Sequence, residues 1–170
     1  MRPIILIGYM GAGKSTVGRF LARQEQLDFY DTDAMIEEQQ GCTISDIFAE
    51  TGEQAFRDME TALVKQLIEK QMSDAVFAAG GGLPVREENR ALLKRLGTVV
   101  YLMADKETVL ERVQGSNNRP LLAGEGLAAK VERMLAERDP LYRAAADILI
   151  ETGDKQPELI AKEIAAAAKK

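Results

Sequence analysis

The sequence predicts an α/β fold of three layers, in which a parallel sheet of five strands lies between two layers of helices. Three observations carry this prediction. Short apolar runs alternate with longer helical patterns along the 170 residues. The apolar runs are continuous, which is typical of strands that are buried on both faces. The connections between them are short, and strand–helix–strand units of this kind build a parallel sheet covered by helices.

The expected elements follow one another in a regular order. The strands are residues 3–8, 27–30, 75–79, 98–103 and 147–150. The helices are residues 14–24, 33–40, 44–49, 53–71, 86–95, 106–113, 127–145 and 157–168. Within residues 53–71 the apolar side chains recur at helical spacing. The length suits one domain and no linker divides the chain, so we expect a single domain over residues 1–170.

The composition excludes several classes of function. The chain has no histidine and one cysteine, so it cannot form a Ser-His-Asp triad, a histidine metal site or a multi-cysteine zinc site. A general base is therefore expected to be a carboxylate. With 22 basic and 27 acidic residues the net charge is −5, which argues against nucleic acid as a partner. The apolar run at residues 4–7 is too short for a signal peptide or a membrane span. We expect a cytoplasmic protein with no membrane partner.

Residues 8–15 contain a phosphate-binding motif. Their sequence, Gly-Tyr-Met-Gly-Ala-Gly-Lys-Ser, matches GxxxxGK[ST] between an expected strand and an expected helix. The glycines allow successive backbone N–H groups to surround a phosphate, and the helix N-terminus adds partial positive charge. Lys14 supplies a cation, and the Ser15 hydroxyl is a hard ligand for Mg²⁺. The motif predicts a nucleoside-triphosphate site, but it does not separate a kinase from a switch or a motor.

Two carboxylates, Asp31 and Asp33, follow the second expected strand. Side chains two apart at a strand end project to the same side, and ligands of such sheets bind beyond the carboxyl ends of the strands. One acid would serve Mg²⁺ and the other would hold or deprotonate an acceptor hydroxyl. The alternative is that a Thr or Asp here caps the helix that follows.

Two further features point to an acceptor site. Gly80, Gly81 and Gly82 end the third expected strand and allow a ligand to approach the backbone closely. Arg57 lies at helical spacing from Glu53 and Glu60, for which a surface set of salt bridges is the default interpretation. A third feature, residues 115–126, is a long polar loop, and its composition suits a functional lid and a plain surface loop equally.

In order and spacing, the motifs of the chain resemble those of shikimate kinases, over nearly the whole length. They are the phosphate loop, Asp31-Thr32-Asp33, Gly52-Glu53-Gln54-Ala55-Phe56-Arg57, Gly80-Gly81-Gly82, Arg119-Pro120-Leu121-Leu122 and Arg138-Asp139-Pro140-Leu141-Tyr142. The phosphate loop is generic, whereas the other motifs together are specific. The chain has Tyr9 where the family often has leucine, and Ala79 before the glycines is a second minor variation.

The resemblance implies a P-loop kinase with strand order 2-3-1-4-5, a substrate-binding segment at about residues 32–60 and a lid at about residues 115–126. The implied reaction moves the γ-phosphoryl group of ATP, with Mg²⁺, to the 3-hydroxyl of shikimate, a step of aromatic amino acid biosynthesis. Shikimate and ATP are the expected partners, and the expected state is a monomer.

The resemblance also implies roles for individual residues. Lys14, Asp33 and Arg119 would be catalytic, with Arg119 delivered by the lid. The nucleotide would be bound by Gly11, Ala12, Gly13, Lys14, Ser15, Thr16, Arg112, Arg119 and Lys155. Shikimate would be bound by Asp33, Arg57, Gly80, Gly81, Gly82 and Arg138, with the two arginines on its carboxylate and backbone N–H groups of the glycines adding contacts. Mg²⁺ would be held by Ser15 and Asp31. For Arg112, a favourable position at a helix C-terminus is the alternative to stacking on adenine.

Two other functions remain open at the level of sequence. The first is a kinase of the same fold that phosphorylates another small polyol acid or a nucleotide. The second is a nucleotide-dependent switch or interaction module, in which the phosphate loop senses rather than transfers. Arg57 and Arg138 would be of no use to such a switch.

Overall fold

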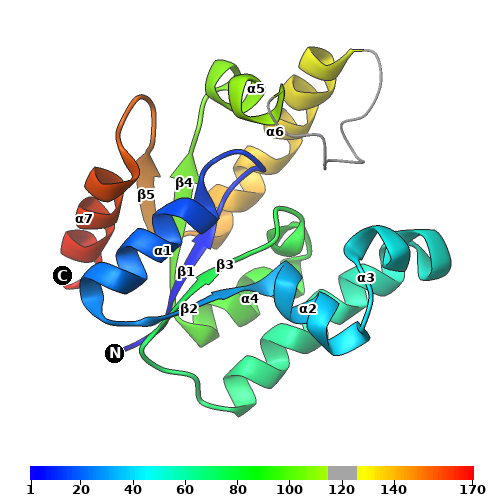
Figure 1. Cartoon of the computed structure of the whole chain (residues 1–170), viewed down its shortest axis with the longest axis horizontal. Helices are drawn as coiled ribbons and strands as arrows, with labels where there is room; N and C mark the ends of the chain where they lie inside the picture. The colour runs from blue at the N-terminus through cyan, green and yellow to red at the C-terminus, as the bar shows by residue number, and fades with distance from the viewer. Residues whose placement is uncertain (115–125) are drawn as a thin grey trace.

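A computed structural model describes residues 1–114 and 126–170 of the chain. It contains a parallel sheet of five strands, β1 (Ile4–Ile7), β2 (Asp28–Asp31), β3 (Ala75–Ala78), β4 (Thr98–Met103) and β5 (Ile148–Glu151). The strand order is β2-β3-β1-β4-β5, as the sequence predicts, and helices lie on both sides of the sheet (Figure 1).

The helices lie close to their expected positions. They are α1 (Lys14–Glu25), α2 (Thr32–Gln40), α3 (Ile44–Glu69), α4 (Glu87–Leu96), α5 (Lys106–Gln114), α6 (Leu127–Ala145) and α7 (Pro157–Ala168), with a short 3-10 helix η1 (Leu83–Val85) that the sequence analysis did not predict. The expected boundary between helices at residues 44–49 and 53–71 is confirmed, because α3 consists of two helical parts that meet at a residue with a non-helical backbone. A kink at Gly52 (φ 85°, ψ 168°) marks the place where the boundary was expected.

The central strand β1 shows why the apolar runs are continuous. Its Ile5 and Ile7 face a core formed with α3, α4 and α6, whereas Ile4 and Leu6 face a second core formed with α1 and α7. All four side chains are at most 1% exposed. Successive residues of β1 thus face opposite sides of the sheet, and all of them are apolar because helices cover both sides.

The sheet register brings the ends of three strands together. Ala78 of β3 pairs with Leu6 of β1 on one side and with Asp31 of β2 on the other. Because the strands are parallel, the segments that follow them leave at one edge of the sheet. The phosphate loop (residues 8–15), the Asp31–Asp33 turn and the glycine turn (residues 80–82) are therefore neighbours.

The helix α2 and the N-terminal half of α3 form a lobe beside this edge (Figure 1). Side-chain caps fix the start of both helices of the lobe. Asp31 caps α2 by accepting from the amides of Asp33 and Ala34, and Thr43 forms a capping box with Asp46 at the start of α3.

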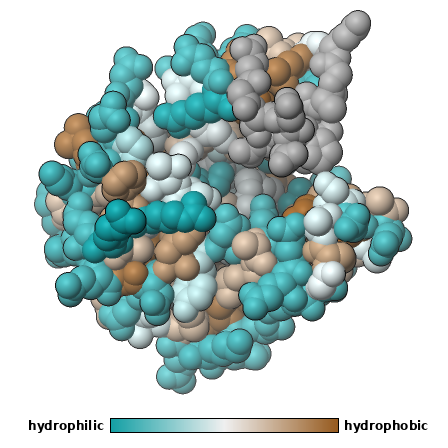
Figure 2. All heavy atoms as spheres, in the orientation of Figure 1, coloured by the Kyte–Doolittle hydropathy of each residue, from teal (hydrophilic) through white to brown (hydrophobic). Residues whose placement is uncertain are grey.

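The face of the molecule drawn in Figure 2 is largely hydrophilic, with apolar side chains scattered over it. In the part of the chain that the structure describes, no helix has both the length and the apolar character needed to cross a bilayer.

Candidate active site

A cavity of about 940 Å³ lies where the three strand-end segments meet. It collects most of the site residues that the sequence predicts. Those on its wall are Gly11, Gly13, Lys14, Ser15, Thr16, Asp31, Asp33, Arg57, Gly80, Gly81, Gly82, Arg112 and Arg138. Residues of the lobe, among them Ser45 and Phe48, complete the wall.

The phosphate loop has the backbone that its glycines predict. Gly11 and Gly13 have left-handed φ angles of 83° and 88°, and α1 then begins at Lys14 with no side chain capping its first turn. Its first N–H groups therefore remain available to an anion. Lys14 Nζ donates to the carbonyls of Gly8 (2.7 Å) and Tyr9 (3.2 Å). Ala12 is buried and does not line the cavity, so a contact of Ala12 with nucleotide would have to come from its backbone.

Ser15 and Asp31 lie together at the base of the cavity. The Ser15 hydroxyl donates to Asp31 Oδ2 at 3.1 Å, while Asp31 Oδ1 accepts from the amides of Asp33 (2.9 Å) and Ala34 (3.2 Å). Asp31 thus is the helix cap as well as a neighbour of the phosphate loop. Across residues 1–114 and 126–170 no three acidic or cysteine side chains gather closely enough to hold a metal by themselves. A Mg²⁺ ion held by these two oxygens would need water and phosphate oxygens to complete its shell.

Asp33 does not cap the helix, so the capping alternative for this residue is wrong. Its Oδ1 is buried without a hydrogen-bond partner and lies against the glycine turn. Burial raises the pKa of its carboxyl, and the nearby charge of Asp31 raises it further, while Lys14 and Arg57 act in the opposite direction. Asp33 is thus a carboxylate with one buried oxygen, Oδ1, that has no hydrogen-bond partner within the described residues.

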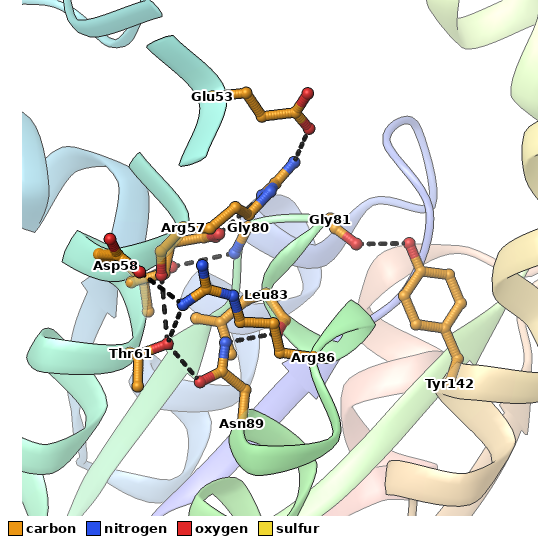
Figure 3. A network of polar contacts seen from close by, with 12 residues as sticks. Glu53, Arg57, Asp58, Thr61, Gly80, Gly81, Leu83, Arg86, Asn89 and Tyr142 are labelled. Atoms are coloured by element: carbon orange, nitrogen blue, oxygen red, sulfur yellow. Dashed lines mark hydrogen bonds and ion pairs between the residues drawn. The ribbon is translucent and has the colours of Figure 1, made fainter. Parts of the chain in front are cut away.

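Arg57 has the partners that its spacing predicts, but it does not lie on the surface. It forms an ion pair with Glu53 at 3.1 Å (Figure 3). It forms a second ion pair with Glu60 at 2.6 Å, and its side chain is only 12% exposed. A Cβ at position 82 would overlap its guanidinium, which explains the glycine there. Its place on the cavity wall fits the predicted acceptor site better than the default interpretation of a surface salt bridge.

Glu60 is a site residue that sequence reasoning missed. Its side chain is fully buried on the cavity wall, and its Oε2 has no hydrogen-bond partner. Burial raises its pKa to about 7, even though the charge and hydrogen bond of Arg57 lower it. The spacing from Arg57 revealed the ion pair, but the burial that makes the pair unusual comes from the packing of α3 on the glycine turn.

The glycine turn is fixed by hydrogen bonds from three elements. Thr32 Oγ1 accepts from the Gly80 amide at 2.9 Å, and the Tyr142 hydroxyl donates to the Gly81 carbonyl at 2.6 Å. Asn89, fully buried on α4, donates to the Leu83 carbonyl at 2.9 Å. The Gly80 amide, one of the N–H groups of the turn expected to contact a substrate, thus already has a partner in Thr32.

Asn89 also connects the turn to α3. Its Oδ1 accepts from the Thr61 hydroxyl at 2.7 Å, and Thr61 in turn accepts from Arg86 at 3.3 Å (Figure 3). Arg86 forms an ion pair with Asp58 at 2.9 Å. This network fixes the helix that carries Arg57 relative to the glycine turn. It was not predicted, because its members come from separate segments and form no motif.

The remaining predicted residues divide into three cases. Arg112 donates to the Gly11 carbonyl at 2.7 Å, so it lies on the phosphate loop and does not serve only as a charge at the end of α5. Lys155 forms an ion pair with Glu163 at 3.0 Å and is not on the cavity wall. Arg119 and nearly all of the expected lid lie outside the described residues.

The cavity has two chemically different parts. One part, formed by the phosphate loop with Lys14, Ser15 and Arg112, offers N–H groups, cations and a hydroxyl, which suits a polyphosphate with its metal. The other part, formed by Asp33, Arg57 and Arg138, combines two guanidinium groups with a carboxylate, which suits a small hydroxylated acid. Phosphoryl transfer depends chiefly on such positioning and on charge stabilisation.

Comparison with known proteins gives a consistent result. The model of the shikimate kinase family matches residues 10–169. The chain is 47% identical to the shikimate kinase of Neisseria gonorrhoeae over 89% of this chain and 88% of that protein. It is 45% identical to that of Pseudomonas syringae pv. tomato over 98% of this chain and 95% of that protein.

Solved structures agree with the sequence relatives. The shikimate kinase of Acinetobacter baumannii in complex with shikimate superposes with a TM-score of 0.92 at 41% identity, covering 98% of this chain and 92% of that one. The shikimate kinase of Aquifex aeolicus gives 0.84 at 37% identity, with coverage of 98% and 96%. A gluconokinase from Sinorhizobium meliloti gives 0.59 at 18% identity, covers 98% and 93% of the two chains, and shows a shared fold alone.

Proposed function

Since the chain belongs to the shikimate kinase family, we propose that its cavity is where the γ-phosphoryl group of ATP passes to the 3-hydroxyl of shikimate. The chain is an enzyme that phosphorylates shikimate with ATP and Mg²⁺, in the pathway to aromatic amino acids. The observation that carries the assignment to this cavity is the meeting of the phosphate loop with Asp33, Arg57 and Arg138 in one space.

The nucleotide would lie along the phosphate loop. The N–H groups at the start of α1 and the ammonium of Lys14 would bind its phosphates, and Lys14 would exchange its two carbonyl contacts for phosphate oxygens. Ser15 and Asp31 fit a hard cation, because two oxygen donors lie 3.1 Å apart beside the loop. Mg²⁺ bound there would neutralise charge on the phosphates. Arg112 would add a second cation above the loop.

Shikimate would occupy the second part of the cavity. Its carboxylate would accept hydrogen bonds from Arg57 and Arg138, whose planar groups can each bond two oxygens. The attacking hydroxyl would donate to Asp33, which has an unused oxygen, and the raised pKa makes this carboxylate a better proton acceptor than an ordinary aspartate. Backbone groups of Gly81 and Gly82 would supply further contacts. Arg119 would complete the site as a lid residue.

An assay of ADP release with a panel of acceptors tests this function. We expect turnover with shikimate that far exceeds turnover with gluconate, with nucleoside monophosphates, or with water alone as the acceptor. NMR of the product should then show the phosphate on the 3-hydroxyl. Absence of shikimate-dependent turnover would contradict the proposal. Slow ATP hydrolysis that ignores every acceptor would support a nucleotide-dependent switch in its place.

The organisation of the protein is also part of the proposal. We propose one domain over residues 1–170 that works as a monomer, because the phosphate loop, Asp33, Arg57 and Arg138 already line one cavity without a contribution from a second chain. The substrate-binding segment would span about residues 32–60 and the lid about residues 115–126. A cytoplasmic location fits an enzyme that consumes ATP and has a single, unpaired cysteine. Light scattering after size-exclusion chromatography tests the monomer, and a mass near twice 18.7 kDa would contradict it.

A further inference from the structure

Tyr9 occupies an unspecified position of the phosphate loop, yet its side chain is 1% exposed. Its hydroxyl donates to Met134 Sδ at 3.2 Å, and its ring faces the guanidinium carbon of Arg138, which is 5.9 Å from the ring centroid. Met134 and Arg138 are four residues apart in α6 and therefore lie on one face of that helix. The side chain of Tyr9 thus contacts the helix that carries one of the two acceptor arginines.

The backbone of Tyr9 belongs to the nucleotide side of the cavity. Its carbonyl accepts from Lys14 Nζ at 3.2 Å and from the Ala12 amide at 3.0 Å. One residue therefore connects the loop that would bind ATP with the arginine that would bind the acceptor.

The two arginines of the acceptor site are held in different ways. Arg57 has two carboxylate partners, Glu53 and Glu60, within ion-pair distance. Among residues 1–114 and 126–170, no carboxylate lies within that distance of Arg138. The aromatic face of Tyr9 is on one side of Arg138. Tyr142 is another neighbour, and the charge and hydrogen bond of Arg138 partly offset the burial that raises the pKa of the Tyr142 hydroxyl to about 12. The charge of Arg138 also lowers the pKa of Glu60, although Glu60 is outside ion-pair distance.

We propose that Tyr9 is a positioning residue for the acceptor, and that its ring directs the guanidinium of Arg138 toward the carboxylate of the substrate. An aromatic face attracts a cation without supplying a competing anion. The positive charge of Arg138 therefore stays available to the acceptor, whereas a carboxylate partner would have to be displaced or shared. This inference rests on the proposed function, in which Arg138 binds the acceptor carboxylate.

Three variants at position 9 separate the ring from the rest of the side chain. Tyr9→Phe keeps the ring and removes the hydroxyl that donates to Met134, so it is the matched control. Tyr9→Leu removes the ring, and Tyr9→Met is a second ring-free variant with a different shape in case the leucine fails to pack. Thermal unfolding of each variant identifies those that remain folded at the assay temperature.

The measurement is the dissociation constant of shikimate and of ATP by calorimetry, together with kcat and KM. We expect Tyr9→Leu or Tyr9→Met to weaken shikimate binding between about 2-fold and 30-fold, the range of a cation–π contact. ATP binding should change less than about 2-fold, and Tyr9→Phe should resemble the wild type in both. Equal weakening of both substrates, no weakening, or equal effects of Phe and the ring-free variants would overturn the inference.

A double-mutant cycle with Arg138→Ala assigns the effect to the proposed pair. In that background the loss of the Tyr9 ring should leave the dissociation constant of shikimate unchanged. If it weakens binding as much as in the wild-type background, Tyr9 does not act through Arg138. The acceptor panel on the wild-type enzyme tests the function separately. Shikimate turnover in the wild type without the selective effect at position 9 would reject only the present inference.

Discussion

The Oδ1 atom of Asp33 lies 2.5 Å from the point that a Cβ of residue 80 would occupy. The backbone of Gly80 is thus part of the surface against which this carboxylate is packed. Gly80 does not have a left-handed φ, so the backbone conformation does not require a glycine at this position. A glycine is needed because Asp33 leaves no space for a Cβ. The relation ties the position of the proposed base, at the start of α2, to the turn that follows β3.

Replacement of Gly80 with alanine should therefore displace Asp33. We expect a fall in kcat of about 100-fold or more, in the range of a lost general base, with ATP affinity nearly unchanged. Gly81→Ala is the matched control for folding, because a Cβ there meets its nearest atom at 3.5 Å, an ordinary contact. Steady-state kinetics and nucleotide titration of both variants check this. A Gly80→Ala enzyme with normal kcat would show that Asp33 can move without cost.

Asp33→Asn keeps the shape of the side chain and removes its ability to accept a proton. We expect kcat to fall by about 10² to 10⁴, with a much smaller change in ATP affinity. The pKa of Asp33 is raised, so activity should be lost as the pH falls through a value above 3.8, the ordinary value of aspartate, because the protonated acid cannot act as a base. Equal losses in kcat and ATP affinity would contradict this role.

Lys14→Ala should abolish turnover and leave the fold intact, since the ammonium donates to two loop carbonyls and would bind the transferred phosphate. Lys162→Ala is a suitable control, because that lysine is exposed on α7 and far from the cavity wall. Circular dichroism should give similar spectra for both variants and the wild type. Near-normal kcat in Lys14→Ala would contradict the phosphate role of this residue.

Arg57→Ala should raise the KM for shikimate strongly and leave the KM for ATP unchanged. The variant also leaves Glu60 without its partner, and an uncompensated buried charge costs about 3–5 kcal/mol. Arg57→Ala combined with Glu60→Gln removes that charge and isolates the effect on binding. Arg86→Ala, in the same network but not on the cavity wall, is the control. An unchanged KM for shikimate in both Arg57 variants would return Arg57 to a structural role.

Glu60 should make the free energy of unfolding depend on pH. Its pKa is about 7 in the folded protein against 4.5 for an ordinary glutamate, so the folded state binds this proton more tightly. The contribution of Glu60 is therefore greatest below about pH 4.5 and falls by roughly 3 kcal/mol as the pH rises to about 7. Urea unfolding of the wild type and Glu60→Gln at pH 5 and pH 8 measures this. The stability of the wild type relative to the variant should be lower at pH 8, and an equal difference at both values would contradict the prediction.

The fold was largely predictable because its signals are local. Continuous apolar runs identified all five strands, and the phosphate loop fixed the start of α1 at Lys14. The break within α3 was also predicted, because a glycine near the end of a helical pattern often ends the helix, and the backbone of Gly52 is indeed non-helical. The short helix η1 was missed, since three residues are too few for a periodic pattern.

The candidate site was predictable where a motif spans it and not where distant segments meet. Asp31, Asp33 and the three glycines are motif residues, and all five line the cavity. Thr32 and Tyr142 also belong to motifs, but the motifs do not show that these two side chains, together with Asn89, fix the glycine turn from three different elements. Only the tertiary packing brings them to one turn. The burial of Glu60 has the same origin, since its sequence spacing alone is that of a surface ion pair.

The kink at Gly52 separates two parts of α3, and each part contributes side chains to the cavity wall. Residues 44–51 contribute Ser45 and Phe48 to the wall, whereas Arg57 belongs to the part beyond the kink, which packs into the core. The two parts touch through the rings of Phe48 and Phe56, whose centroids are 5.2 Å apart. Under the proposed function, the wall of the acceptor site and the arginine that would bind the acceptor carboxylate thus come from separate segments. A wider acceptor could be accommodated by redesigning eight residues of the lobe, while the arginine that selects an acid stays in place.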